Sequence, residues 1–81
     1  SGGLAGTVAD PKIIFGRALA LRAAAIVLIH NHPSGNPKPS TSDKSLTNNM
    51  REAGKFLDLP VLDHIIVAGK QYVSFADEGL I

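Results

Sequence analysis

Four residues whose types suit metal-dependent chemistry stand at fixed spacing in the middle of this sequence. They are His30, His32, Ser40 and Asp43, in the pattern His-x-His, seven residues, Ser, two residues, Asp. Imidazole nitrogens and carboxylate oxygens bind zinc, and catalytic zinc sites use three protein ligands with a fourth position left for water. Two histidines and an aspartate therefore predict an open metal site. Zinc is the expected cofactor, although the same ligand types also suit iron, manganese or nickel.

The two histidines follow an apolar run, residues 23–29, that we expect to form a strand. Residues i and i+2 of a strand project from the same face, so His30 and His32 can reach one point. A loop rich in proline follows over residues 33–39 and should hold His32 and Ser40 in place, because proline restricts the backbone. The alternative is that this loop is a plain connector.

Ser40 and Asp43 also have an interpretation that needs no metal. A serine followed three residues later by an acid resembles a capping box, in which both side chains only start a helix. Because two histidines end the preceding strand, we favour metal ligation by Asp43. The start of the helix would direct its carboxylate back toward the loop.

The remaining pattern predicts five elements in the order helix, strand, helix, strand, strand. Asp10 and Pro11 form a helix start, with Asp10 as the N-cap and Pro11 in the first turn. The first strand is continuously apolar and suits a strand buried on both faces. A turn at residues 68–70 should join the last two strands as a hairpin. The expected ranges are residues 11–22, 24–29, 40–57, 61–67 and 72–75.

Length, charge and composition limit the classes of protein to consider. The chain has 81 residues and no cysteine, so we expect one small globular domain without disulfides, located in the cytoplasm. No apolar run approaches the roughly 20 residues of a membrane helix. Eight basic residues are offset by seven acids for a net charge of +1, whereas nucleic-acid-binding domains usually carry a basic stripe.

The four spaced residues match the second part of the JAMM (MPN-type) metalloprotease motif, a glutamate followed later by His-x-His-x7-Ser-x2-Asp. The surrounding sequence is similar to the RadC family of bacterial JAMM domains over essentially the whole chain. Its matching segments are His-Asn-His-Pro-Ser-Gly at 30–35, Pro-Ser at 39–40 and Leu-Asp-His-Ile-Ile at 62–66. The resemblance implies an α/β (α+β) fold with an MPN/JAB-like, cytidine-deaminase-like sheet flanked by helices. Further strands would precede residue 1, leaving an exposed sheet edge that could pair two copies as a homodimer.

The resemblance also implies a zinc metallopeptidase or isopeptidase acting on a peptide or protein substrate. In that family the motif serine, here Ser40, donates a hydrogen bond to the oxyanion, and an upstream glutamate is the general base. No glutamate precedes His30. The acidic residue that precedes it is Asp10, which we expect to be a helix N-cap. Either the glutamate lies before Ser1 in a longer protein, which we favour, or the protein has lost it. We therefore expect these 81 residues to bind metal weakly and cleave little.

Two alternatives from other classes remain: a DNA-repair-associated module, as the family's historical label suggests, and an inactive protein-interaction scaffold. A Ser-His-Asp triad through Asp63 and His64 is not expected, because adjacent strand residues point to opposite faces. His64 should share a face with Leu62 and Ile66 and serve as a core histidine or as one that supports the metal ligands.

Overall fold

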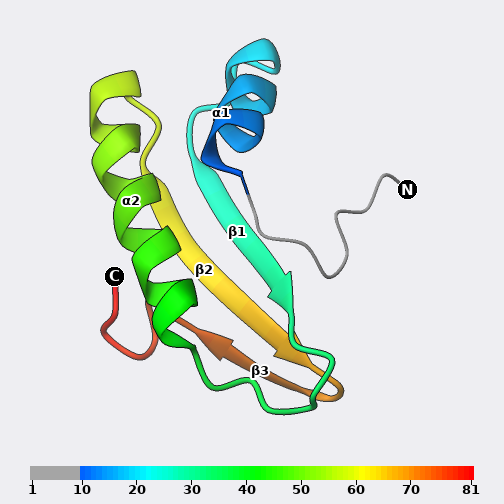
Figure 1. The fold of residues 1–81 in the computed structure, drawn as a ribbon. Helices are drawn as coiled ribbons and strands as arrows, with labels where there is room; N and C mark the ends of the chain where they lie inside the picture. The colour runs from blue at the N-terminus through cyan, green and yellow to red at the C-terminus, as the bar shows by residue number, and fades with distance from the viewer. Residues whose placement is uncertain (1–9) are drawn as a thin grey trace.

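The computed structural model describes residues 10–81, which form two helices and three strands (Figure 1). This order confirms the predicted α/β (α+β) succession of helix, strand, helix, strand, strand. Residues 1–9 lie outside the described part. The elements are α1 Pro11–Ala20, β1 Ile26–Asn31, α2 Thr41–Leu57, β2 Val61–Ala68 and β3 Gln71–Ser74.

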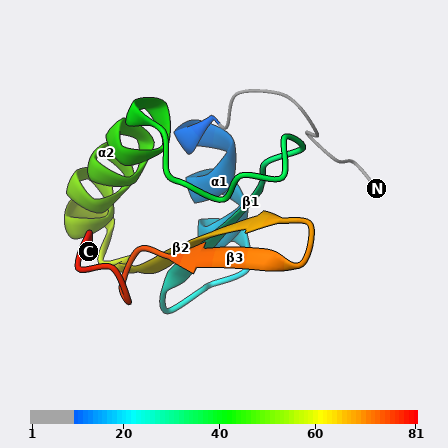
Figure 2. The same ribbon diagram turned by 90° about the horizontal axis from the view of Figure 1, so that it is seen from below.

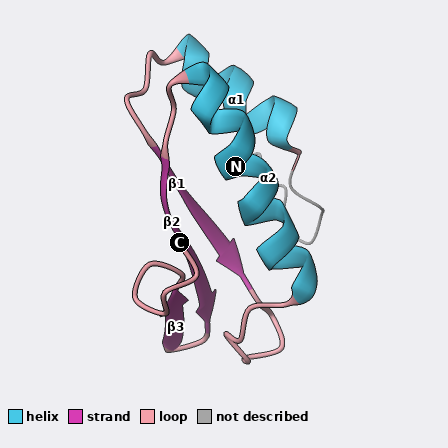
Figure 3. Ribbon diagram, turned by 90° about the vertical axis from the view of Figure 1, so that its left-hand side faces the viewer, coloured by secondary structure: helices cyan, strands magenta, loops and turns pink. Residues whose placement is uncertain are grey.

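The three strands form one mixed sheet in the order β1-β2-β3. β1 runs parallel to β2, and β2 pairs antiparallel with β3 around a turn at Gly69, whose φ of 60° favours glycine. Figures 2 and 3 show both helices on one side of this sheet. The result is two layers, with β1 at one edge among the described residues.

Both helices begin where the sequence predicts. The N-cap of α1 is Asp10, whose Oδ1 accepts a hydrogen bond from the Lys12 N–H at 2.9 Å, and Pro11 occupies the first turn. The predicted cap is thus confirmed, which commits the Asp10 side chain to the helix start. α1 ends at Ala20, two residues before the predicted end, and Arg22 follows with a left-handed φ of 54°.

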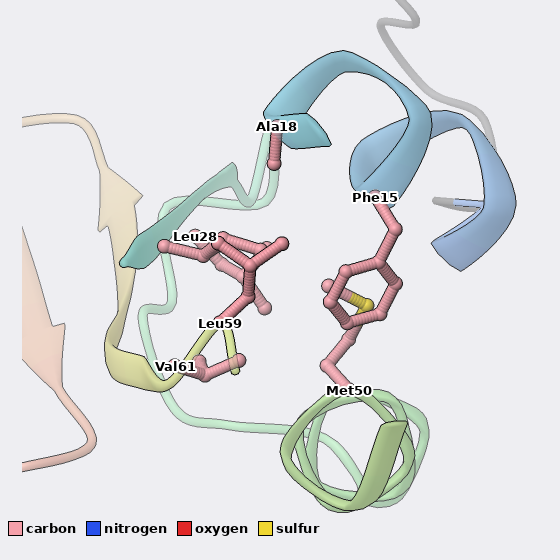
Figure 4. Close-up of a cluster of buried hydrophobic side chains, with 7 residues drawn as sticks. Phe15, Ala18, Leu28, Met50, Leu59 and Val61 are labelled. Atoms are coloured by element: carbon pink, nitrogen blue, oxygen red, sulfur yellow. The ribbon is translucent and has the colours of Figure 1, made fainter. Parts of the chain in front are cut away.

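One cluster of apolar side chains fills the space between the helices and the sheet (Figure 4). Phe15 of α1 and Met50 of α2 meet in this layer, and Met50 is fully buried. Both helices thus direct some of their apolar residues toward the core, whereas Leu21 and Leu57, at 71% and 41% exposed, lie outside it. Its buried members are Phe15, Ala18, Ile26, Leu28, Met50, Leu59 and Val61.

The prediction that the first strand is buried on both faces is wrong for the described residues. Ile26 and Leu28 face the helices and are buried, but Val27 and Ile29 on the other face are 48% and 73% exposed. The strand also continues through His30 to Asn31, beyond its predicted end. The apolar run therefore did not reveal that the face of β1 with Val27 and Ile29 is left uncovered by residues 10–81.

An irregularity between β1 and β2 corrects another expectation. Ile26 pairs with Val61, but the next residue of β1, Val27, pairs with Asp63, which leaves Leu62 as an extra residue in β2. Such a bulge reverses the alternation of faces. His64 therefore shares the buried face with Ile66, as predicted, whereas Leu62 is 55% exposed and does not belong to it.

Neither helix in the described part of the chain has the length and apolar character needed to cross a membrane.

Candidate metal site

His30, His32 and Asp43 converge on one point between the sheet and the start of α2. His30 Nδ1 lies 2.9 Å from Asp43 Oδ1, and His32 Nε2 lies 3.0 Å from Asp43 Oδ2. The candidate ligand atoms of all three residues lie within 4.8 Å of one another. The side chain of Asp43 is only 4% exposed, whereas those of His30 and His32 are 42% and 17% exposed. The carboxylate thus lies deepest, and the site opens to solvent past His30.

The sheet and the loop together orient the two histidines. His30 pairs with Ile66 in the ladder, and the N–H of His32 donates to the Val67 carbonyl at 2.8 Å, so both are anchored on β2. His32 Nδ1 lies 2.9 Å from the Asn36 carbonyl oxygen, which can only accept. The Nδ1–H must therefore donate there, which leaves His32 Nε2 free to face Asp43.

The capping box at the start of α2 aims the carboxylate. The Ser40 N–H donates to Asp43 Oδ2 at 2.8 Å, and the Asp43 N–H donates to Ser40 Oγ at 3.0 Å. The capping interpretation is confirmed, and the geometry is also compatible with metal ligation, because the carboxylate that caps the helix faces the two histidines. The Ser40 hydroxyl oxygen accepts the hydrogen bond from the Asp43 N–H, so its own hydrogen remains available for another acceptor.

Electrostatics favour an ionised Asp43. Burial alone would raise the pKa of its carboxyl group, but hydrogen bonding from Ser40 and the nearby His30 and His32 outweigh burial. The pKa therefore lies below its ordinary value of 3.8, so the group carries a full negative charge at neutral pH. A buried anion beside two imidazoles suits a cation.

His64 lies behind this site. Its side chain is fully buried, with Nδ1 2.7 Å from the Thr47 hydroxyl oxygen. The ring stacks on Phe75 with the centroids 4.6 Å apart, and lies 6.0 Å from His30 at an interplanar angle of 23°. The position agrees with the predicted supporting role. Thr47 was missed, although its spacing of one helical turn from Asp43, on the buried face of α2, was a usable signal.

Asp63 does not form a catalytic triad with its neighbour. Its carboxylate accepts hydrogen bonds from the His64 backbone N–H at 2.7 Å, from the Ser74 hydroxyl at 2.6 Å and from the Ala76 N–H at 2.9 Å. These bonds attach the end of β3 to β2. Burial would raise the pKa of Asp63, but the hydrogen bonds outweigh it and lower the pKa.

The buried state of His64 predicts a pH dependence of stability. Burial lowers the pKa of His64 from 6.5 more strongly than nearby carboxylates raise it, so the folded state holds the ring neutral. The unfolded chain then binds the extra proton as the pH falls below about 6.5, and the free energy of unfolding should decrease there. Stability should be recovered fully above that value.

Urea unfolding of the metal-free protein between pH 7.5 and 5 measures this effect. His64→Asn should flatten the profile in that window. The lowered pKa values of Asp43 and Asp63 affect stability only at more acidic pH, because both lie below 3.8. An unchanged slope in His64→Asn would contradict the assignment.

The donor set fits zinc. Two imidazole nitrogens and a carboxylate are ligands that zinc accepts, and bonds of about 2.0–2.2 Å around a tetrahedral ion place neighbouring ligands roughly 3.4 Å apart. The present separations of up to 4.8 Å are close to that spacing. His30, His32 and Asp43 could therefore hold a zinc ion at a site that is exposed to solvent at His30.

Comparison with known proteins identifies the family of this chain. A model of the family described as the RadC-like JAB domain matches residues 1–80. A UPF0758 protein of Flavobacterium johnsoniae is 44% identical over 79 residues, and one of Salinibacter ruber is 45% identical over 80 residues. A UPF0758 protein of Methanosarcina barkeri is also 45% identical over 80 residues.

These matches cover 98–99% of this chain but only 34–35% of each relative. The chain thus spans about a third of the length of the curated relatives that it matches. Because the family model covers nearly every residue, the chain belongs to the RadC-like JAB domain family.

Proposed function

We propose that this domain is a zinc-dependent metallopeptidase or isopeptidase of the RadC type, acting on an amide bond of a peptide or protein. The supporting observation is the convergence of His30, His32 and Asp43 from two separate elements onto one solvent-facing point. A zinc ion held by these three residues would supply a water of pKa about 7 and would polarise the substrate carbonyl. Family membership supports the reaction class.

The surrounding residues would each have a distinct role. His32, held by the Asn36 carbonyl, presents Nε2 to the metal in a fixed tautomer. Ser40 lies beside the carboxylate and keeps one hydroxyl hydrogen, which would donate to the oxyanion that forms on the substrate. Asp10 caps α1 and is not available as a general base. We propose that the base is the upstream glutamate of the family motif, which these 81 residues do not contain.

Zinc titration of the complete domain, with any segment that carries the upstream glutamate, tests the metal site. We expect one equivalent to bind at micromolar zinc and to be removed by a chelator. If the protein takes up no metal under these conditions, the hydrolase proposal fails. The alternative of a non-catalytic protein-interaction or DNA-repair-associated module would then be favoured.

Hydrolysis of isopeptide-linked substrates tests the chemistry in the longer protein that carries this domain. Ser40→Ala should lower the rate by about 100-fold, the usual effect of losing one oxyanion donor. Ser40→Thr is the matched control, because it keeps both the hydroxyl group and the helix cap. Equal rates in the alanine variant and the parent protein would exclude the oxyanion role.

A further inference from the structure

A buried polar pair joins the sheet to α2 directly behind the candidate metal site. His64 of β2 and Thr47 of α2 are each only 1% exposed, and His64 Nδ1 lies 2.7 Å from Thr47 Oγ1. Burying a polar group costs free energy unless the group is hydrogen-bonded. Because each member of this pair provides a hydrogen-bond partner for the other, the pair is a specific contact between two elements that contribute to the site.

The direction of the hydrogen bonds follows from the chemistry of the hydroxyl group. Thr47 Oγ1 donates its single hydrogen to the backbone carbonyl of Asp43, one turn earlier in α2, at 2.9 Å. It can then only accept from His64, so Nδ1 of His64 carries the proton. The bonds run from His64 through Thr47 to the main chain of Asp43.

His64 also contacts the other half of the site. In the ladder it pairs with Leu28, two residues before His30 on the same face of β1. Its ring lies nearly parallel to that of His30, with 6.0 Å between centroids, and stacks on Phe75 at 4.6 Å. One buried ring thus supports a histidine of the sheet by packing and an aspartate of the helix by hydrogen bonding.

We propose that His64 and Thr47 are positioning residues that set the distance between Asp43 and the two histidines of the metal site. The inference rests on the proposed function, because it concerns the geometry of the same ligands. Neither residue would touch the metal or the substrate. Loss of such an outer partner typically lowers metal affinity by about 10- to 100-fold.

The test compares zinc affinity in the full chain, measured by competition with a chelating dye, among matched variants. Thr47→Val removes the hydroxyl group at nearly constant volume and should weaken zinc binding by about 10- to 100-fold. Thr47→Ser keeps the hydroxyl group and should restore affinity close to that of the parent protein. The visible spectrum of the cobalt-substituted protein, which reports ligand geometry, should change in Thr47→Val and return in Thr47→Ser.

Ser74→Ala separates positioning from general destabilisation. Ser74 is also buried and hydrogen-bonds to Asp63 at 2.6 Å, but it belongs to the β3 end of the sheet. Its loss should lower the unfolding midpoint without changing zinc affinity or the cobalt spectrum.

Three outcomes would overturn the inference. Unchanged affinity and spectrum in Thr47→Val would refute it while leaving the proposed function intact. An equal loss of affinity in Ser74→Ala would show that destabilisation alone accounts for the effect. Absence of zinc binding by the parent protein would refute the proposed function and this inference together.

Discussion

Asp43→Ala is expected to abolish measurable zinc binding and to weaken the start of α2 at the same time. The carboxylate faces His30 through Oδ1, while Oδ2 lies near both His32 and the Ser40 N–H. Its removal takes away the anionic ligand, so affinity should fall by more than the roughly 10- to 100-fold that a lost outer partner costs. The lost cap should reduce the free energy of unfolding by about 1 kcal/mol.

Asp43→Asn separates the two effects, because an amide oxygen can still cap the helix but carries no charge. Zinc titration and urea unfolding of both variants measure them in parallel. Glu52→Ala is the control, since this carboxylate lies on the exposed side of the same helix and pairs with Lys55. It should leave zinc binding unchanged. Parent-like zinc affinity in Asp43→Ala would exclude this residue as a ligand.

Gly54→Ala is expected to destabilise the domain severely. A Cβ atom at this position in α2 would overlap the backbone carbonyl oxygen of Leu59 and lie 3.3 Å from its carbonyl carbon. That backbone is fixed, because the Leu59 N–H donates to the Gly54 carbonyl at 2.8 Å and its side chain is in the core. Overpacking of this kind costs about 3 kcal/mol or more, a large part of the stability of a small domain.

Gly16→Ala is the matched control for this substitution. Gly16 lies in α1, and an added Cβ would meet no atom of residues 10–81 within 4 Å. Alanine should therefore stabilise the helix by about 0.5–1 kcal/mol. Urea unfolding of the two variants should give changes of opposite sign, and a stable Gly54→Ala protein would contradict the close approach.

Local signals in the sequence explain what could be predicted. Asp10-Pro11 and the Ser40 to Asp43 spacing act within a few residues, so the helix starts could be assigned without tertiary information. The convergence of His30 and His32 follows from the two-residue period of a strand. The sequence did not show that the start of α2 lies against the end of β1, and the structure shows this arrangement.

Features that depend on contacts between distant segments could not be predicted. The exposure of Val27 and Ile29 depends on which layers cover the sheet, and the bulge at Leu62 depends on the pairing of β1 with β2. The bond between Thr47 and His64 joins residues 17 positions apart on a helix and a strand. No local pattern encodes these pairings, although Thr47 stands out as a polar residue on the buried face of its helix.

The carboxylate shared by the helix cap and the candidate ligand set links cation occupancy to folding. The unfolded chain does not hold His30, His32 and Asp43 together, so a bound ion would favour the folded state by mass action. At a free concentration 100 times the Kd this linkage amounts to about 2.7 kcal/mol. The melting temperature of the domain would then rise with the metal supply, so thermal denaturation would report how fully the site is loaded.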